Sequence, residues 1–382
     1  MSGRPGVWAV GQEGERTMSA FVTCRRLLPP VLSLLFLAAP CLAQQHPAAL
    51  QAVIDAARKE GRIDINNGPG VLGMPDALKE VEAGIKKQFG IDLPVGWSPS
   101  PSPTAQITKL ATESRAGIDA STDLFTVAAP AAAPYIGKGL FRKVAWTELM
   151  PSRITPEVVE GDGEALRLET QLPGLLYNLK AAPWAPGIQT MADLLKPELK
   201  GKFASNPFLA GIDVLLSPEA WGVAKTTDYV RKFATQISGL VRCGDAQARV
   251  ASGEFPALAL DCIGGDQNML KFKGKNLLDT KIIADSAQRR YLYMTIPVRA
   301  RHPNAAILFA LYMSTPEAQR IILGHDGADL DTYPDSSNSQ RVKEYEAKGV
   351  HFIDVTIAWW ARQPADLSSA LAEIVKIASQ QN

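Results

Sequence analysis

The side chains best suited to contact a ligand are uncharged hydrogen-bonding groups in two loop-like stretches. Asn66 and Asn67 begin the turn-forming sequence NNGPG, and Ser100, Ser102 and Thr104 belong to the Ser-Pro stretch SPSPSPT. Amide and hydroxyl groups hold the polar atoms of a ligand by hydrogen bonds, but they are poor acids and bases at neutral pH. Their grouping predicts reversible binding of a polar ligand rather than bond-breaking chemistry.

Three further candidates come from the later part of the chain. Asn206 follows the strand-like FAS, and Asp213 begins the segment into which a polar loop then leads. Tyr177 stands near the end of the apolar run LPGLLYN. Each would offer a hydrogen-bonding group near a strand end. For Tyr177, packing within an extended connection is the competing interpretation. Tyr291 and Tyr293 could also contribute to a site.

Catalytic motifs with a defined mechanism are missing from the sequence. It contains no Gly-x-Ser-x-Gly elbow, no His-Glu-x-x-His pair and no Gly-x-x-x-x-Gly-Lys phosphate loop. The four histidines are far apart. We therefore expect a protein that is not an enzyme. A pair of acidic residues could still catalyse a reaction, and Asp213 and Asp266 would be the first acids to test.

The composition indicates a globular protein with more than one compact lobe. The chain has 382 residues, of which 46% are hydrophobic, and a formal net charge of +1. This length suits two lobes better than one small core. Because basic residues form no block, we do not expect nucleic acid as a partner.

The N-terminal segment is typical of a secretory signal peptide. From Met18 the chain reads MSAFVTCRRLLPPVLSLLFLAAPCLAQQ: two arginines, an apolar run and small residues that end at Ala43. A membrane anchor is the alternative, but the apolar run is short and contains prolines. We expect residues 1–43 to be removed, residues 1–17 to precede the true start, and the mature protein to act in the periplasm.

Two cysteines, Cys243 and Cys262, follow the predicted cleavage site. In an oxidising compartment they are expected to form a disulfide. Two buried free thiols are the alternative. Two cysteines are too few for a cysteine-based metal site, and we expect neither a cofactor nor a bound metal.

Helices and strands should alternate over residues 47–130. Apolar spacing and turn residues predict helices at 47–61, 78–89 and 104–117, with Thr104 as the cap of the third, and strands at 62–65, 91–97 and 123–127. Short connections favour parallel strands with helices on both faces. A ligand of such a sheet binds outside the carboxyl ends of the strands, and two of those ends lead into helix N-termini.

A second α/β unit should follow. Residues 166–180 are predicted to be an extended crossing, and 203–207, 246–262, 281–284 and 291–299 to contain strands. Pro303 and the apparent capping box Ser314–Glu317 predict two helices that pack back on the first unit. We also expect Trp359 and Trp360 to pack against a lobe. The amphipathic helix at 367–377 should cover the first unit.

Several of these segments resemble periplasmic solute-binding proteins of ABC importers, most closely the ferric-iron-type branch. The similar segments are, in chain order, EGRIDINNG, FGIDLPVGW, STDLFTV, LLYNLK with DLLKPELKGK, VASGEFPALAL and HPNAAILFALYMSTPEAQ, and the resemblance covers about residues 47–320.

The resemblance implies a type II periplasmic-binding-protein fold, with two α/β lobes joined by two hinge strands. Lobe 1 would hold residues 44–165 and 300–382, and lobe 2 residues 166–299. A monomer would close over a small solute and deliver it to the membrane subunits of the importer.

One departure concerns the ferric branch, whose members commonly carry adjacent tyrosines after the GEFPALAL-like strand. Here Asp261 to Asp266 occupy that position, and none of the eight tyrosines is adjacent to another. The identity of the solute therefore stays open. Two alternatives to transport also remain, an enzyme on the same fold and a sensor subunit that presents its ligand to a membrane receptor.

Overall fold

A computed structural model describes residues 46–68, 70–100, 102–262, 264 and 277–380. The predicted signal peptide and Asp266 lie outside these residues. Residues 46–382 form one compact unit. Over the part of the chain that the structure describes, no helix is both long enough and apolar enough to cross a lipid bilayer.

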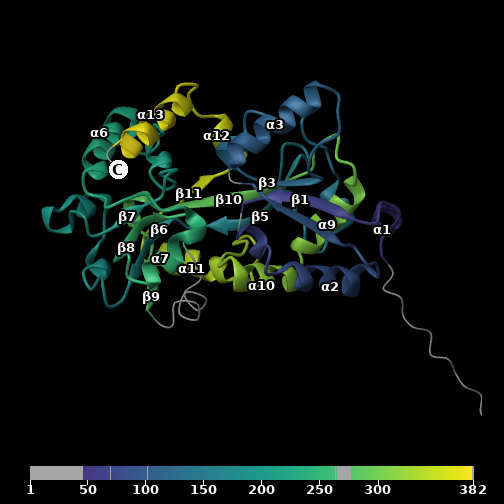
Figure 1. The fold of residues 1–382 in the computed structure, drawn as a ribbon, viewed down its shortest axis with the longest axis horizontal. Helices are drawn as coiled ribbons and strands as arrows, with labels where there is room; N and C mark the ends of the chain where they lie inside the picture. Colours follow the sequence, from purple (N-terminus) through teal and green to yellow (C-terminus); the bar gives the residue numbers. More distant parts are fainter. Residues whose placement is uncertain (1–45, 69, 101, 263, 265–276, 381–382) are drawn as a thin grey trace, which may run out of the picture. The chain divides into compact units, whose positions relative to one another are not determined.

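The larger of two sheets has seven strands within the described residues, in the order β2-β1-β3-β10-β5-β4 with β11 beside β10 (Figure 1). Its strands are β1 (Ile63–Asn67), β2 (Val95–Pro99), β3 (Leu124–Ala128), β4 (Val159–Glu160), β5 (Ala165–Gln171), β10 (Gln288–Thr295) and β11 (Ile353–Val355). As predicted, β1 is parallel to both β2 and β3. Strand β10 lies between β3 and β5 and is antiparallel to both. It therefore connects the parallel strands β2, β1 and β3 with β5 and β4 in one sheet.

Helices cover both faces of this first sheet (Figure 1). They include α1 (Ala48–Glu60), α2 (Leu78–Phe89), α3 (Pro103–Arg115), α4 (Ala129–Ala132), α5 (Trp146–Leu149), α9 (Pro303–Met313) and α10 (Pro316–His325). Helix α9 packs against α1 and α10 against α2, so the prediction that the helix pair returns to the first unit is confirmed. The capping box is wrong in its register, because Thr315 and not Ser314 caps α10 by accepting the Ala318 N–H.

The second sheet has four strands among the described residues, in the order β7-β8-β6-β9. They are β6 (Gly174–Asn178), β7 (Ala204–Ser205), β8 (Ala257–Asp261) and β9 (Leu278–Lys281), and the helices α6 (Gly222–Ala234) and α7 (Ala246–Ala251) accompany them. The predicted disulfide is confirmed: Cys243 and Cys262 are bonded with their Cα atoms 5.7 Å apart. It ties the segment before α7 to the end of β8.

The C-terminal segment differs from the prediction. It contains α11 (Ser337–Glu346), β11, α12 (Ile357–Ala361) and α13 (Leu367–Gln380). Helix α13 lies along α6 of the second unit and not on the first, where we expected it (Figure 1). Its apolar residues join the second hydrophobic core, together with Trp359 and Trp360, which are 5% and 7% exposed. The packing of the tryptophans is thus confirmed.

The chain passes between the two sheets at residues 172–173, which separate β5 from β6, and at residues 282–287, which separate β9 from β10. The first position lies within the predicted crossing at 166–180. The return to the first sheet is complete before residues 291–299, which we expected to carry it, because β10 already forms its hydrogen bonds within the first sheet. It passes a third time after β11, since α13 packs with the second core. The lobe boundaries at 165/166 and 299/300 stay a prediction.

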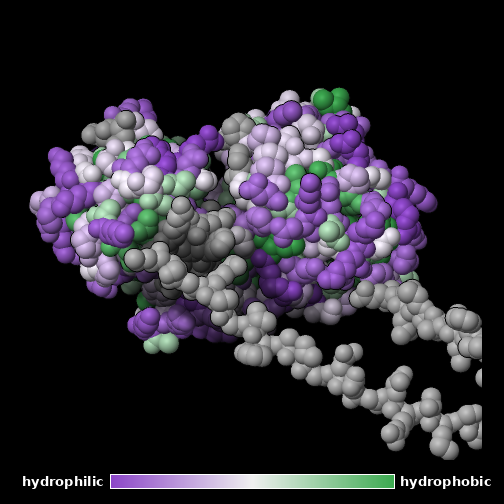
Figure 2. All heavy atoms as spheres, turned by 60° about the horizontal axis from the view of Figure 1, so that its bottom comes forward, coloured by the Kyte–Doolittle hydropathy of each residue, from purple (hydrophilic) through white to green (hydrophobic). Residues whose placement is uncertain are grey.

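Figure 2 shows a face on which hydrophilic residues predominate and hydrophobic residues occur in small groups. The large hydrophobic side chains that are most exposed among the described residues are scattered along the chain: Ile118, Leu179, Phe208, Val223 and Val298. Single exposed apolar residues of this kind are normal on a protein surface.

Candidate functional site

The carboxyl ends of β1 and β2 bring polar side chains together as the sequence predicts. Asn66 lies opposite Ser98 in the parallel pairing, and its Nδ2 donates to Ser98 Oγ at 3.0 Å. Its Oδ1 atom is inaccessible to solvent and accepts no hydrogen bond from the described residues. A buried carbonyl without a donor is costly unless a ligand or water supplies one. Asn66 is therefore a side chain of this edge with an unused hydrogen-bond acceptor.

Asn67 and Ser100 mainly shape the edge. Asn67 is 1% exposed, and its Oδ1 accepts the Trp97 Nε1–H at 2.5 Å. Its backbone carbonyl accepts the Ser100 N–H at 2.7 Å. The Ser100 hydroxyl, also buried, donates to the Ser102 carbonyl at 3.4 Å. These bonds hold the two strand ends together, so both residues position the edge more than they offer polar atoms to a ligand.

Ser102 begins α3 and corrects the predicted cap. Its hydroxyl accepts the Ala105 N–H at 3.2 Å, and Pro103 occupies the first helical position, where its missing N–H costs nothing. Thr104, which we expected to be the cap, is the second residue of the helix and is exposed. The N-terminus of this thirteen-residue helix directs backbone N–H groups and a partial positive charge toward the same edge.

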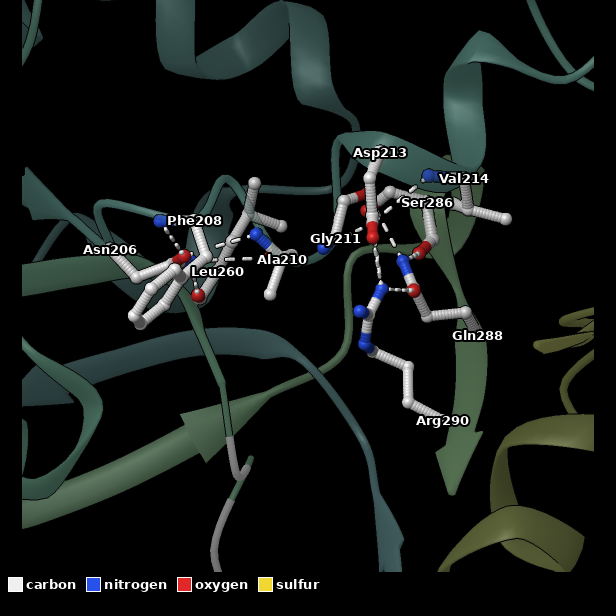
Figure 3. Close-up of polar contacts among 10 residues, drawn as sticks. All are labelled: Asn206, Phe208, Ala210, Gly211, Asp213, Val214, Leu260, Ser286, Gln288 and Arg290. Atoms are coloured by element: carbon white, nitrogen blue, oxygen red, sulfur yellow. Dashed lines mark hydrogen bonds and ion pairs between the residues drawn. The ribbon is translucent and has the colours of Figure 1, made fainter. Parts of the chain in front are cut away.

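Asn206 has a structural role in the loop that follows β7 (Figure 3). Its Nδ2 donates to the carbonyls of Leu260 at 2.6 Å and Ala210 at 3.2 Å, and its Oδ1 accepts the N–H groups of Phe208 and Ala210 at 3.0 Å. Its two donors and two acceptor sites are therefore occupied. The side chain is fully buried. It stabilises the loop and leaves no polar atom for a ligand.

Asp213 is held by the strand β10 (Figure 3). Arg290 Nη1 lies 2.7 Å from its Oδ1 and 2.5 Å from its Oδ2, and the same Oδ1 accepts the N–H groups of Gly211 and Val214. Gln288 completes the cluster by accepting from Arg290 and donating to the Gly211 carbonyl. This buried ion pair links the loop after β7 to a strand of the first sheet.

Tyr177 does not join Asn206 and Asp213. On β6 it pairs with Ala257 of β8, whereas Asn206 bonds to Leu260 toward the other end of β8. Its hydroxyl donates to Asp279 Oδ2 at 3.1 Å. Burial first, and then the charge of Asp279, raise the pKa of the phenol above its ordinary value. Tyr177 is thus a packed core residue, in line with the competing interpretation.

The tyrosines of β10 lie away from the end of β8. Tyr293 is fully buried and donates to Glu160 Oε1 at 2.6 Å, and Tyr291 packs under Arg167. Among the described residues one group, Asp64, Asp123 and His302, places three potential metal ligands within 4.8 Å of one another. Asp123 there accepts the His302 N–H at 2.9 Å, and its other oxygen lies 2.7 Å from Nδ1. Asp123 thereby fixes His302, the residue before α9, while Glu60 accepts the first N–H groups of the helix, those of Asn304 and Ala305.

Two residues that matter at these sites escaped the sequence analysis. Ser98 would have been found by extending the predicted strand to residue 99, since it then faces Asn66 across a parallel pair. Arg290 gave no local signal, because its partner Asp213 lies 77 positions earlier. Contacts over such separations depend on the register of whole strands.

Comparison with known proteins identifies the family. Residues 83–349 match the family described as bacterial extracellular solute-binding protein. Curated protein sequences gave no match.

Three solved structures with a similar fold each align with 84% of this chain. The spermidine/putrescine ABC transporter substrate-binding protein PotD from Streptococcus pneumoniae has a TM-score of 0.59, 15% identity and 99% of its own chain covered. AfuA from Actinobacillus pleuropneumoniae, a periplasmic binding protein with fructose-6-phosphate bound, has a TM-score of 0.64 and 16% identity over 99% of its chain. Iron-bound HitA from Pseudomonas aeruginosa has a TM-score of 0.59 and 16% identity over 99% of its chain.

These three proteins share one fold although their names mention quite different solutes, so the fold does not choose the solute. The family match extends over most of the chain and includes β2, both crossings between the sheets and the loop of Asp213. The chain therefore belongs to the bacterial extracellular solute-binding protein family and has the two-lobe α/β fold of these structures.

Proposed function

We propose that this protein captures a small, oxygen-rich solute at the carboxyl edge of β1 and β2 and delivers it to the membrane subunits of an ABC importer. In this proposal residues 1–43 direct export to the periplasm, and the mature protein acts there as a monomer. Residues 172–173 and 282–287 act as hinges between the lobes. Binding energy would be used to close the lobes, and the closed form would be recognised by the importer.

One observation carries the proposal: Asn66, with an unsatisfied side-chain oxygen, stands beside Ser98 and near the N-terminus of α3, which Ser102 caps. Asn66 and Ser102 offer uncharged polar groups, while the helix end favours negatively charged or oxygen-bearing groups. No carboxylate belongs to this set, which argues against a polyamine. A sugar phosphate, of the kind named for AfuA, fits the edge better.

A thermal-shift screen tests the function. The full chain would be heated with fructose-6-phosphate, a phosphonate, spermidine, thiamine and ferric iron in turn. A solute at 100 times its Kd stabilises the folded state by about 2.7 kcal/mol, which is readily seen as a higher Tm. Chemical conversion of a bound probe would instead support the alternative of an enzyme.

Calorimetry with variants tests the site. Asn66→Ala and the double variant Ser102→Ala with Thr104→Ala should each weaken binding of the hit about tenfold, since a hydrogen bond contributes about 0.5–1.5 kcal/mol. Thr108→Ala is a matched control, because Thr108 lies on α3 and bonds to the carbonyl of Thr104. Unchanged affinity in both test variants would reject this placement of the solute.

A further inference from the structure

A pocket separate from the edge of β1 and β2 lies against β10, on the face of the strand opposite to Asp213. It has a volume of about 380 Å³ and is lined by residues of β5, β10, β11 and α11 and of the loop 331–334. We call it the β10 pocket. It contains none of the residues that the proposed function places at the solute, namely Asn66, Ser98 and Ser102. Its volume lies within the range of small-molecule sites.

The inner wall of the β10 pocket carries two donor groups without a hydrogen bond to any described residue. Arg167 uses Nε and Nη2 to bind Glu160 Oε1 at 3.2 and 3.1 Å, and its guanidinium carbon lies 4.0 Å from the centre of the Tyr291 ring. Its Nη1 and the Tyr291 hydroxyl form no hydrogen bond within the described residues. Tyr291 is 3% exposed and the Arg167 side chain 10%. Buried donors of this kind favour an acceptor from a ligand.

A neighbouring cation in the pocket is already neutralised. Arg289 makes a bidentate pair with Asp354, with Nη2 2.6 Å from Oδ2, and its Nη1 lies 3.3 Å from Asp331 Oδ2. These three residues form a closed network on one wall. Arg167 is likewise paired with Glu160. Within the described residues the inner wall therefore offers two donors that form no hydrogen bond, the Arg167 Nη1 and the Tyr291 hydroxyl. Such a pair suits a single carboxylate.

The outer part of the β10 pocket has the opposite character. Glu157 and Glu346 line it and are exposed, and Lys343 is the exposed base beside them. Over the whole lining four acids stand against three bases. This excess of acids disfavours a multiply charged anion such as phosphate. It suits a molecule that carries both a carboxylate and a cationic nitrogen.

We propose that the β10 pocket binds a small zwitterion of the amino-acid class. Its carboxylate lies against Arg167 Nη1 and the Tyr291 hydroxyl, and its cationic group lies near Glu157 and Glu346. Successive residues of a strand face opposite sides, so Arg290, next to Tyr291 and Arg289, reaches the loop of Asp213 instead. A zwitterion in the pocket thus contacts the same strand that holds that loop.

Calorimetry on the full chain tests this proposal with L-alanine, L-glutamine and glycine betaine, and with acetate and ethylamine as half-ligands. At least one zwitterion should bind about tenfold or more tightly than either half-ligand. Tyr291→Phe should weaken that binding five- to tenfold, and it disturbs no internal hydrogen bond of the described chain. Tyr135→Phe, outside the pocket, is the matched control and should leave the affinity unchanged.

Further outcomes decide the class and the place of the ligand. The double variant Glu157→Gln with Glu346→Gln should weaken the zwitterion but not acetate. The proposal is overturned if no zwitterion binds at millimolar concentration, if acetate binds equally well, or if Tyr291→Phe has no effect. Asn66→Ala should not change zwitterion binding. If Asn66→Ala abolishes it and Tyr291→Phe does not, the zwitterion is the transported solute and the β10 pocket is not its site.

Discussion

Replacing Asp213 by Asn should destabilise the protein strongly, because it leaves the charge of Arg290 buried without its partner. The two side chains are 3% and 10% exposed, and their closest atoms are 2.5 Å apart. Asn keeps an oxygen that accepts the N–H groups of Gly211 and Val214, so the change mainly removes the negative charge. Breaking one side of a buried ion pair costs about 3–5 kcal/mol.

The reverse change, Arg290→Met, should cost a similar amount, since it leaves the Asp213 carboxylate buried and unpaired. The double variant Asp213→Asn with Arg290→Met removes both charges and should cost much less than the sum of the single changes. The expected coupling free energy is about 2 kcal/mol or more, because the contact is direct and buried.

Urea unfolding followed by circular dichroism measures the free energy of unfolding of all four proteins in the cycle. The urea concentrations at the midpoints of unfolding give the differences in the free energy of unfolding, provided that the dependence of this free energy on urea is the same in all variants. If each single variant loses less than about 1 kcal/mol, or if the costs simply add, the pair behaves like an exposed ion pair. The structural link between β10 and the Asp213 loop would then be refuted.

Two further predictions concern the end of β8. Burial raises the pKa of Asp261 in the folded protein to about 6. The folded state therefore favours the protonated carboxyl. The contribution of this group to stability is fully present below the pKa that Asp261 has in the unfolded chain, and it is lost as the pH rises through about 6. Asp261→Asn should remove this loss, worth up to about 3 kcal/mol at neutral pH; equal pH profiles of unfolding in both proteins would contradict it. Replacing Cys243 and Cys262 by Ser should cost about 3 kcal/mol for a separation of 19 residues. Calorimetric unfolding with a reductant should reproduce that loss in the native chain and leave the variant unaffected.

Local sequence patterns determined most elements of the fold. Alternation and helical spacing placed α1, β1, α2 and β3 within a few residues of their observed bounds, because the apolar faces of these elements all pack into one core. The same patterns indicated that Asn66 and Ser102 share an edge, since parallel strands end together. The family resemblance added the two-lobe arrangement, which the comparisons confirmed.

Tertiary structure decided what each polar residue does. Ser102 rather than Thr104 caps α3 because Pro103 sets the helix start, and the two hydroxyls are too alike in sequence to show this. Asn206 and Asp213 look like ligand residues until the register of β8 and β10 supplies their partners. Likewise, the amphipathic pattern of α13 does not tell which of the two hydrophobic cores it covers. In the folded chain α13 packs on the second core, along α6. Periodicity reports burial along one segment, whereas hydrogen-bond partners come from distant segments whose meeting only the folded chain determines.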